Sequence, residues 1–394
     1  MARWFRVLAL TLAGLAALIA IAWWMARPAA PDAFYAAPAG QPPGPGALLR
    51  QEAFDRGVPP HAQGWRILYY TTRHDGSPAV ASAIVVVARK PHDGPRPLVA
   101  WTHGTTGVAP GCAPSLLDDP FANVPALRQA IDKGWVFVGT DYVGLGTSGP
   151  HPYLIGEGEA RSALDSIRAV RQMKEFRLSD GAVVWGHSQG GHAALWTGML
   201  APTYAPELNI LGVVAMAPAS DLRPLLEAVQ GSTVGHIMSS FVLRSYSEAY
   251  PDVKFDAYVS APTRWLARDM SGRCLAGREA LFSVVEAMAT GGSIFRTPPT
   301  SGPLGERLAQ NTPARPLRQP LLIAQGLADD LVLPEIQAKF VQGLCSAGQV
   351  LEYRTYAERD HLSVVAPDAP FAVELVRWTE DRLAGRPAPA GCPP

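Results

Sequence analysis

Residues 183–191 read Val-Val-Trp-Gly-His-Ser-Gln-Gly-Gly, in which an apolar strand runs into a serine and a helical pattern follows. Ser188 has glycines, Gly186 and Gly190, two residues away on either side. A serine at the tip of such a sharp turn takes a strained backbone conformation, and flanking side chains would collide with the neighbouring strand and helix. Gly-x-Ser-x-Gly also arises by chance in glycine-rich turns, but the strand before it and the helix after it predict a nucleophile elbow.

Short apolar strands alternate with helical patterns on both sides of this elbow. We expect strands at residues 65–73, 79–88, 97–102, 135–141, 182–185, 210–216, 321–325 and 350–356. The first two form a hairpin around a turn at residues 75–78, and the later ones are rich in Val, Ile and Leu, as buried parallel strands are. Helices are predicted at residues 157–176, after Ser188 and at residues 371–383. The alternation predicts an α/β fold, with a mostly parallel sheet covered by helices on both faces.

One interval interrupts this alternation and sets the domain organisation. Residues 221–318 contain helical fragments and Pro and Gly breaks but no convincing core strand, which predicts a cap inserted into the core. The core is then residues 47–220 and 319–394. Residues 28–46 are mostly Pro, Ala and Gly and are predicted to be a linker.

The N-terminus predicts export. Arg3 and Arg6 precede an uncharged stretch over residues 7–25, the layout of a signal peptide or a membrane anchor within residues 1–27. Small residues at 26–30 would suit cleavage, whereas Trp23, Trp24 and Arg27 are typical of an interfacial anchor. Both interpretations stay open, and both place the body of the protein outside the cytosol.

Composition excludes several classes of function. The chain has 394 residues, 48% of them hydrophobic, which is enough for a large core. Thirty-four basic residues balance 34 acidic ones without long runs of one sign, so nucleic acid is not a predicted partner. No His or Cys spacing suggests a metal site, and no cofactor is expected. The oligomeric state cannot be predicted from the sequence.

The four cysteines are Cys112, Cys274, Cys345 and Cys392. An even number outside the cytosol favours two disulfides, although four buried free thiols remain an alternative. Sequence alone allows three pairings.

A serine nucleophile needs a base within hydrogen-bonding reach and a carboxylate that orients the base. After an elbow of this kind the expected order is serine, acid, histidine. The strand at residues 321–325 leads to Asp329 and Asp330; we favour Asp329 because it matches a Gly-x-x-Asp-x-x-Val spacing, and keep Asp330 as the alternative. His361 follows the next strand and is the predicted base. The histidines beside the serine, His187 and His192, are expected to shape the elbow or pack on its helix.

Attack by the serine places negative charge on a carbonyl oxygen, which requires two fixed N–H donors. The backbone of Gln189, directly after the nucleophile, is one predicted donor. The loop at residues 102–107 follows the strand at 97–102 and supplies the other: we choose Thr105, with Thr106 in reserve.

Several ordered motifs together resemble the secretory lipase family of the α/β hydrolases. They are Trp-Thr-His-Gly-Thr-Thr-Gly-Val-Ala-Pro-Gly-Cys-Ala-Pro-Ser at 101–115, Thr-Asp-Tyr-Val-Gly-Leu-Gly at 140–146, Gly-His-Ser-Gln-Gly-Gly-His-Ala-Ala at 186–194, and the Asp329 and His361 segments. The resemblance implies the α/β-hydrolase fold, a helical lid, a Ser, Asp, His triad, and triacylglycerols or other carboxylic esters as substrates. It also suggests two disulfides, Cys112 with Cys274 and Cys345 with Cys392.

Three functions are therefore consistent with the sequence. The first is an exported serine carboxylic-ester hydrolase with an acyl-enzyme intermediate. The second keeps the fold and triad in a serine peptidase or an acyltransferase. The third is a non-catalytic binding or cell-envelope protein on a retained fold.

Overall fold

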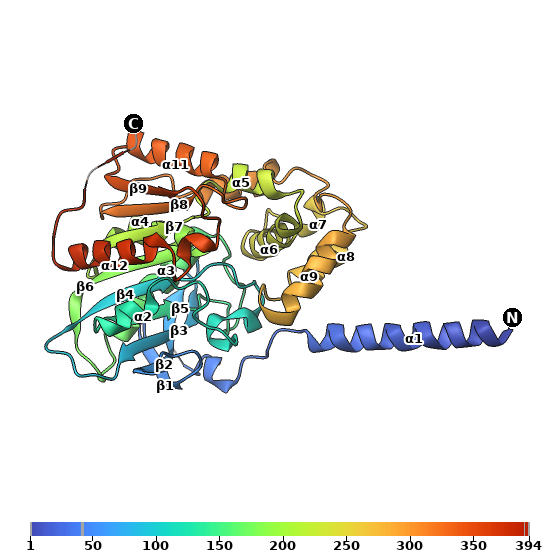
Figure 1. Ribbon diagram of the computed structural model, residues 1–394, viewed down its shortest axis with the longest axis horizontal. Coiled ribbons are helices and arrows are strands. Elements are labelled where there is room, and N and C mark those ends of the chain that lie inside the picture. Colours follow the sequence, from blue (N-terminus) through green and yellow to red (C-terminus); the bar gives the residue numbers. More distant parts are fainter. Residues whose placement is uncertain (1, 41–42, 390, 393–394) are drawn as a thin grey trace.

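The computed structural model describes residues 2–40, 43–389 and 391–392, so residues 1, 41–42, 390 and 393–394 of the predicted segments lie outside the described residues. A twisted sheet forms the centre, a group of helices covers one end of it, and one long helix projects from the molecule (Figure 1). The sheet has nine strands in the order β1-β2-β3-β5-β4-β6-β7-β8-β9. They are β1 (Leu48–Phe54), β2 (Ala62–Thr72), β3 (Pro78–Ala88), β4 (Arg96–Thr102), β5 (Val136–Thr140), β6 (Leu178–His187), β7 (Asn209–Met216), β8 (Leu321–Gly326) and β9 (Leu351–Tyr356).

The strands divide into an antiparallel edge and a parallel remainder. Strands β1, β2, β3 and β5 pair antiparallel, with β2 and β3 forming the predicted hairpin, and β5, β4, β6, β7, β8 and β9 pair parallel. The hairpin turn is fixed by Asp75, whose carboxylate accepts bonds from the amide and hydroxyl of Ser77. The sequence prediction missed β1, an edge strand whose residues are half-buried or exposed and lack a continuous apolar run.

Helices cover both faces of the sheet, as predicted. Alternate residues of β4 point to opposite faces, with Leu98 and Ala100 in one hydrophobic cluster and Val99 and Trp101 in the other. The first cluster includes residues of α3 (Gly156–Val170), α4 (Gln189–Tyr204) and α11 (Pro334–Ser346), and the second includes residues of α2 (Leu127–Asp132) and α12 (Pro370–Leu383).

Helix α3 is shorter than the predicted helix at residues 157–176. It ends at Val170, where the chain turns back toward β6. The Arg171 side chain donates to the carbonyls of Ser179 and Asp180, which fixes this return. Met173 lies beyond the helix but is still buried against the core. Its apolar side chain therefore extended the predicted helix too far.

The interval without strands, residues 221–318, lies between β7 and β8 and is called the cap below. It contains α5 (Leu222–Val229), α6 (Thr233–Ala249), α7 (Phe255–Tyr258), α8 (Arg264–Met270), α9 (Gly277–Ala289) and α10 (Gly302–Gln310). These helices pack around their own hydrophobic cluster, in which Phe241 and Tyr246 are fully buried. The division of the chain into core and cap domains stays a prediction.

The N-terminal region has two parts. Helix α1 (Ala2–Met25) projects from the body (Figure 1), and among the described residues no helix has the length and hydropathy of a membrane-crossing segment. The predicted linker is packed rather than free, because Tyr35 is buried and its hydroxyl bonds Ser115 at 2.8 Å.

Two disulfides join distant segments, and they are the pairs that the resemblance implies. Cys112 is bonded to Cys274, which links the loop after β4 to the cap. Cys345 is bonded to Cys392, which links α11 to the C-terminal segment.

Candidate active site

The turn between β6 and α4 has the strained geometry expected of an elbow. Ser188 has φ 58° and ψ −120°, a backbone conformation that L-residues rarely adopt. A Cβ atom at Gly186 would lie 2.0 Å from the carbonyl oxygen of Gly190, and one at Gly190 would lie 1.9 Å from that of Thr102. Both positions therefore require glycine.

The residues predicted as nucleophile, base and acid are brought together at the ends of three strands. His361 Nε2 lies 2.9 Å from Ser188 Oγ, and His361 Nδ1 lies 2.8 Å from Asp329 Oδ2. Asp329 is buried, whereas its neighbour Asp330 is exposed. The geometry thus favours the first of the two candidate acids.

The Asp329 carboxylate is held by its own loop. Its Oδ1 accepts hydrogen bonds from the amides of Leu331 at 2.9 Å and Val332 at 2.8 Å. Its Oδ2 accepts one from Gln325 Nε2 at 3.1 Å, beside the bond to His361. With both oxygens bonded, the carboxylate has little freedom to turn away from the imidazole.

His187 supports the loop that carries His361. Its Nε2 donates to the carbonyl of His361 at 2.8 Å, and the two rings lie 4.7 Å apart. Burial, reinforced by the neighbouring His361, lowers the pKa of His187 to about 3, so the ring is neutral at ordinary pH. The expectation that His187 shapes the elbow agrees with this contact.

The two residues predicted to supply the backbone amides, Gln189 and Thr105, line the same pocket as Ser188. Among the described residues, neither the Gln189 amide nor the Thr105 amide donates a hydrogen bond to another residue. The loop of Thr105 is tied to the elbow because Thr102 Oγ1 donates to the carbonyls of Gly190 at 2.7 Å and Trp185 at 3.0 Å. The amide of Thr106, the reserve candidate, likewise has no acceptor among the described residues, and its carbonyl accepts from the cap residue Leu275 at 2.7 Å.

Asp141 contacts this loop through its backbone carbonyl and is itself held by its buried carboxylate. Asp141 accepts hydrogen bonds from the hydroxyls of Ser82 and Ser115, each at 2.6 Å, and burial raises its pKa. The His103 ring lies between the carbonyls of Gly104 and Asp141, and burial lowers its pKa to about 4. The His103 ring therefore ties this loop to the backbone after β5.

A second buried network lies behind the elbow. Glu159 accepts hydrogen bonds from Gln189 Nε2 at 2.7 Å and the Leu154 amide at 3.1 Å, and its other oxygen lies 3.1 Å from His192 Nδ1. Burial raises the pKa of Glu159. His151 also contacts the Gln189 side chain at 3.1 Å, and burial lowers its pKa to about 3. The network orients the residue that carries one of the two free amides.

Sequence reasoning missed most of this network. Glu159 lies on the apolar side of a predicted helix, and a single carboxylate there carries no signal of its role. His151 and Tyr153 follow a Gly- and Pro-rich loop, and only the fold brings them to the elbow. His192 was the exception, because its position on the helix after Ser188 placed it beside the site.

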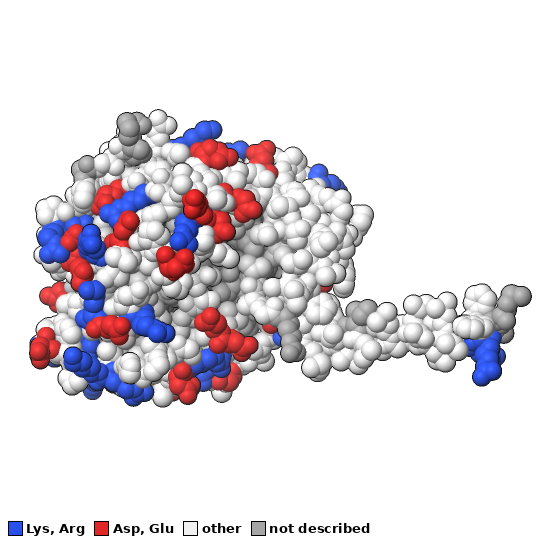
Figure 2. Space-filling view, viewed as in Figure 1, with Lys and Arg blue, Asp and Glu red and all other residues white. Residues whose placement is uncertain are grey.

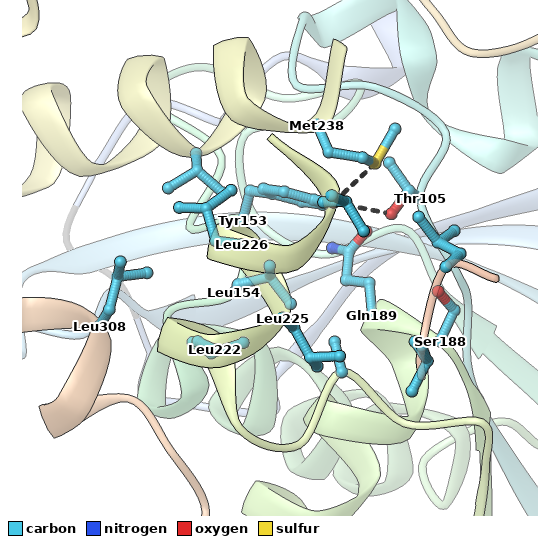
Figure 3. Close-up of a pocket in the computed structure, with 15 residues that line it drawn as sticks. Thr105, Tyr153, Leu154, Ser188, Gln189, Leu222, Leu225, Leu226, Met238 and Leu308 are labelled. Carbon is cyan, nitrogen blue, oxygen red and sulfur yellow. Dashed lines mark hydrogen bonds between the residues drawn. The ribbon is translucent and has the colours of Figure 1, made fainter. Parts of the chain in front are cut away.

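An apolar pocket of about 70 Å³ opens beside Ser188, between the sheet domain and the cap (Figure 3). The Tyr153 hydroxyl bonds Thr105 Oγ1 at 2.9 Å and Met238 Sδ at 3.3 Å across its roof. Apart from Gln189, the rest of the lining is aliphatic: Leu154, Ala219, Leu222, Leu225, Leu226, Val229, Val242, Leu308, Leu331 and Val332. No charged side chain lines this pocket within the described chain.

A larger groove of about 1310 Å³ reaches the same serine from outside. Ser188, His361 and Thr105 line its inner part, and residues at the end of α1 and the start of α9 line its outer part. Within the described ranges, no cluster of His, Cys, Asp and Glu side chains has the arrangement of a metal site.

Solved structures show the same architecture. The chain superimposes on Candida antarctica lipase A in its closed state with a TM-score of 0.72 at 20% identity, over 92% of this chain and 88% of that one. It also superimposes on the rice cell wall degrading esterase LipA (G231F mutant) from Xanthomonas oryzae with a TM-score of 0.68 at 19% identity, over 88% of this chain and 100% of that one. The fold is that of an α/β hydrolase.

Sequence comparison then identifies the family. A family model described as secretory lipase matches residues 122–391, more than half of the chain, which therefore belongs to the secretory lipase family. The chain is 28% identical to the secreted triacylglycerol lipase LIP2 of Malassezia globosa, over 84% of this chain and 75% of the relative. It is 26% identical to the probable inactive lipase MT1628 of Mycobacterium tuberculosis, over 92% and 84%. Its family makes the protein a carboxylic-ester hydrolase.

Proposed function

We propose that the protein is an exported serine lipase or esterase that works through Ser188, His361 and Asp329 and forms an acyl-enzyme. The observation that carries the proposal is the continuous chain of hydrogen bonds from Asp329 through His361 to Ser188, at 2.8 and 2.9 Å, beside an apolar pocket. Export is supported by the secreted relative and by the two disulfides.

In the first half-reaction, Ser188 Oγ attacks the ester carbonyl carbon while His361 Nε2 accepts the hydroxyl proton. Asp329 keeps Nδ1 protonated and stabilises the imidazolium. The Gln189 and Thr105 amides donate to the oxygen that becomes negative, and because they have no other described acceptor they need not break a bond first. The ester bond then breaks, the departing alkoxide takes the proton from His361, and Ser188 carries the acyl group.

In the second half-reaction, water attacks the acyl carbonyl while His361 accepts its proton. The carbonyl–Ser188 bond breaks, Oγ recovers a proton from His361, and the carboxylic acid leaves. The buried neutral rings of His187, His103 and His151 add no positive charge near this site. Among the described histidines only His361 is hydrogen-bonded to Ser188 Oγ, so we assign proton transfer to it.

The substrate that fits the pocket is an ester with an apolar acyl chain, including a triacylglycerol. An aliphatic lining favours a hydrocarbon by burial of apolar surface, at about 0.8 kcal/mol for each methylene. An aminopeptidase-like peptidase would need acidic side chains for a free amine, and the described lining of this pocket has none. The relative named as inactive keeps a non-catalytic protein as the alternative to be tested.

The test is hydrolysis of p-nitrophenyl esters across a range of acyl lengths by the wild type and by Ser188→Ala. We expect the substitution to lower kcat by roughly 10⁴-fold or more, because the attacking atom is removed. Circular dichroism and thermal unfolding of both proteins serve as the folding control. Folded wild type that cleaves no ester of any length, or a variant that keeps full activity, rejects the proposal.

A further inference from the structure

The end of helix α1 is attached to the cap. The Arg273 guanidinium donates to the carbonyl of Ala26 at 2.8 Å and lies 5.1 Å from the centre of the Trp23 ring. On the cap side, it binds the Asp269 carboxylate at 2.7 Å and lies 5.2 Å from the Phe282 ring of α9. Arg273 is only 3% exposed, so α1 and α9 meet at a buried cation.

The chain after α1 is also closely packed. A Cβ atom at Gly111 would lie 2.2 Å from the carbonyl oxygen of Ala29 and 2.6 Å from Pro28 Cβ, so only glycine allows this approach. Cys112 and Cys274 form a disulfide, and residues 26–29 contact the residue before each of them, Gly111 and Arg273. Small residues at 26–30 would suit signal cleavage, but residues 26–29 pack against the folded body.

The same segment forms the mouth of the active-site groove. Met25, Ala26, Arg27 and Ala29 line the groove that contains Ser188, together with Leu275, Ala276 and Gly277 at the start of α9. A surface that binds α1 and α9 would therefore lie next to the opening that leads to the serine.

Both helices present unpartnered apolar side chains to the outside. On α9, Leu281, Val285 and Met288 are 67%, 64% and 69% exposed at spacings of four and three, which puts them on one face. Helix α1 has no acidic residue, and its charged residues, Arg3 and Arg6, lie in its first turns. Figure 2 shows acidic and basic side chains gathered over the sheet domain, while the visible cap is mostly uncharged.

We propose that α1 is retained in the mature protein and that α1 and the outer face of α9 bind one lipid surface, with the mouth of the groove beside it. A helix of 24 residues is about 36 Å long and is apolar on all sides beyond its first turns, which suits lipid better than water or one face of a soluble protein. Arginines near its start attract anionic headgroups. This binding does not require the proposed catalytic residues to be active.

The first experiment measures the intact mass of the full chain after export. Retention predicts a mass that includes Trp23 and Arg27. A mature protein that begins anywhere from residue 27 to residue 31 overturns the proposal, since α1 would be gone.

The second experiment tests α9 in the Ser188→Ala background, which separates it from catalysis. Val285→Cys and Val373→Cys each replace a valine that is 64% exposed on a helix, and the second lies on α12 in the sheet domain. Because the four native cysteines are paired, each added thiol can be labelled selectively with the fluorophore NBD. Vesicles of phosphatidylcholine and phosphatidylglycerol are then added.

We expect the NBD emission at position 285 to rise roughly twofold or more and to shift to the blue, because the probe leaves water for lipid. The emission at position 373 should not change. No response at 285, or an equal response at both positions, overturns the proposal. An inactive wild type with a positive probe response would reject the proposed function and leave this inference standing.

Discussion

The two walls of the active-site pocket are built in different ways. The sheet-domain wall holds all the hydroxyl and amide side chains of the lining, those of Thr105, Tyr153, Ser188 and Gln189, beside four aliphatic ones. Buried carboxylates behind this wall fix it: Asp329 accepts four hydrogen bonds and Glu159 contacts three polar partners. The cap wall is made of aliphatic side chains on α5, α6 and α10 whose contacts have no direction. This difference assigns bond cleavage to one wall and the choice of acyl chain to the other.

The largest effect should come from the polar wall. Asp329→Asn keeps the shape of the side chain but cannot stabilise the imidazolium, so we expect kcat to fall by roughly 10³- to 10⁴-fold for every acyl length. Asp330→Asn, the matched control on an exposed neighbour, should keep near wild-type activity. Steady-state kinetics on short and medium esters measures both. A large loss in the Asp330 variant with little loss in the Asp329 variant would reverse the assignment.

The cap wall should alter preference with little change in chemistry. Leu308 of α10 lies at the far end of the pocket from Ser188 (Figure 3), so Leu308→Ala opens space beyond the acyl chain. We expect the ratio of kcat/KM for longer over shorter acyl chains to rise by about tenfold, the value of roughly two added methylenes. Leu304→Ala removes an equally buried leucine from the same helix outside the pocket and is the control. An equal shift in both variants would show a general loosening of the cap.

The smallest effect concerns stability and its dependence on pH. His187 has a pKa of about 3 when folded and about 6.5 when unfolded, so its contribution to stability is complete above pH 6.5 and is lost as the pH falls toward 3. Relative to His187→Gln, the wild type should lose about 2 kcal/mol of unfolding free energy between pH 7.5 and pH 5. Urea unfolding at both pH values measures this.

A control variant is His61→Gln, which makes the same substitution at an exposed position and is measured at the same two pH values. A difference between wild type and His187→Gln that stays constant with pH would mean that the buried ring is not desolvated as the structure indicates.

The features that depend on a few neighbouring residues could be predicted from the sequence. The elbow, the strands and the order of Ser188, Asp329 and His361 follow from patterns of a few residues at strand ends, and the fold that they predicted is confirmed. Glu159 and Tyr153 reach the elbow only through contacts between segments that are distant in the sequence. No local pattern predicted their place there. The edge strand β1 was missed because its exposed residues lack a buried pattern.

The cap was the least predictable region, because its structure also depends on contacts between distant segments. Its position between two strands could be predicted from the absence of a strand pattern, but its packing depends on helices that touch through interchangeable aliphatic side chains. The contact between Arg273 and Trp23 joins residues that are far apart in the sequence. Trp23 stood out only as part of an anchor pattern, and nothing in the sequence pointed to Arg273 as its partner.

The most direct test of the proposed acyl-enzyme is covalent capture of the nucleophile. The folded protein is incubated with a p-nitrophenyl alkylphosphonate, which reacts with an activated serine and mimics the tetrahedral state, and the adduct is located by peptide mass spectrometry. We expect one adduct per chain, on Ser188, with loss of ester hydrolysis in proportion to labelling and no adduct in His361→Gln at the same exposure. Complete inhibition with the adduct on another residue, or an unmodified Ser188 in a fully inhibited enzyme, would contradict it.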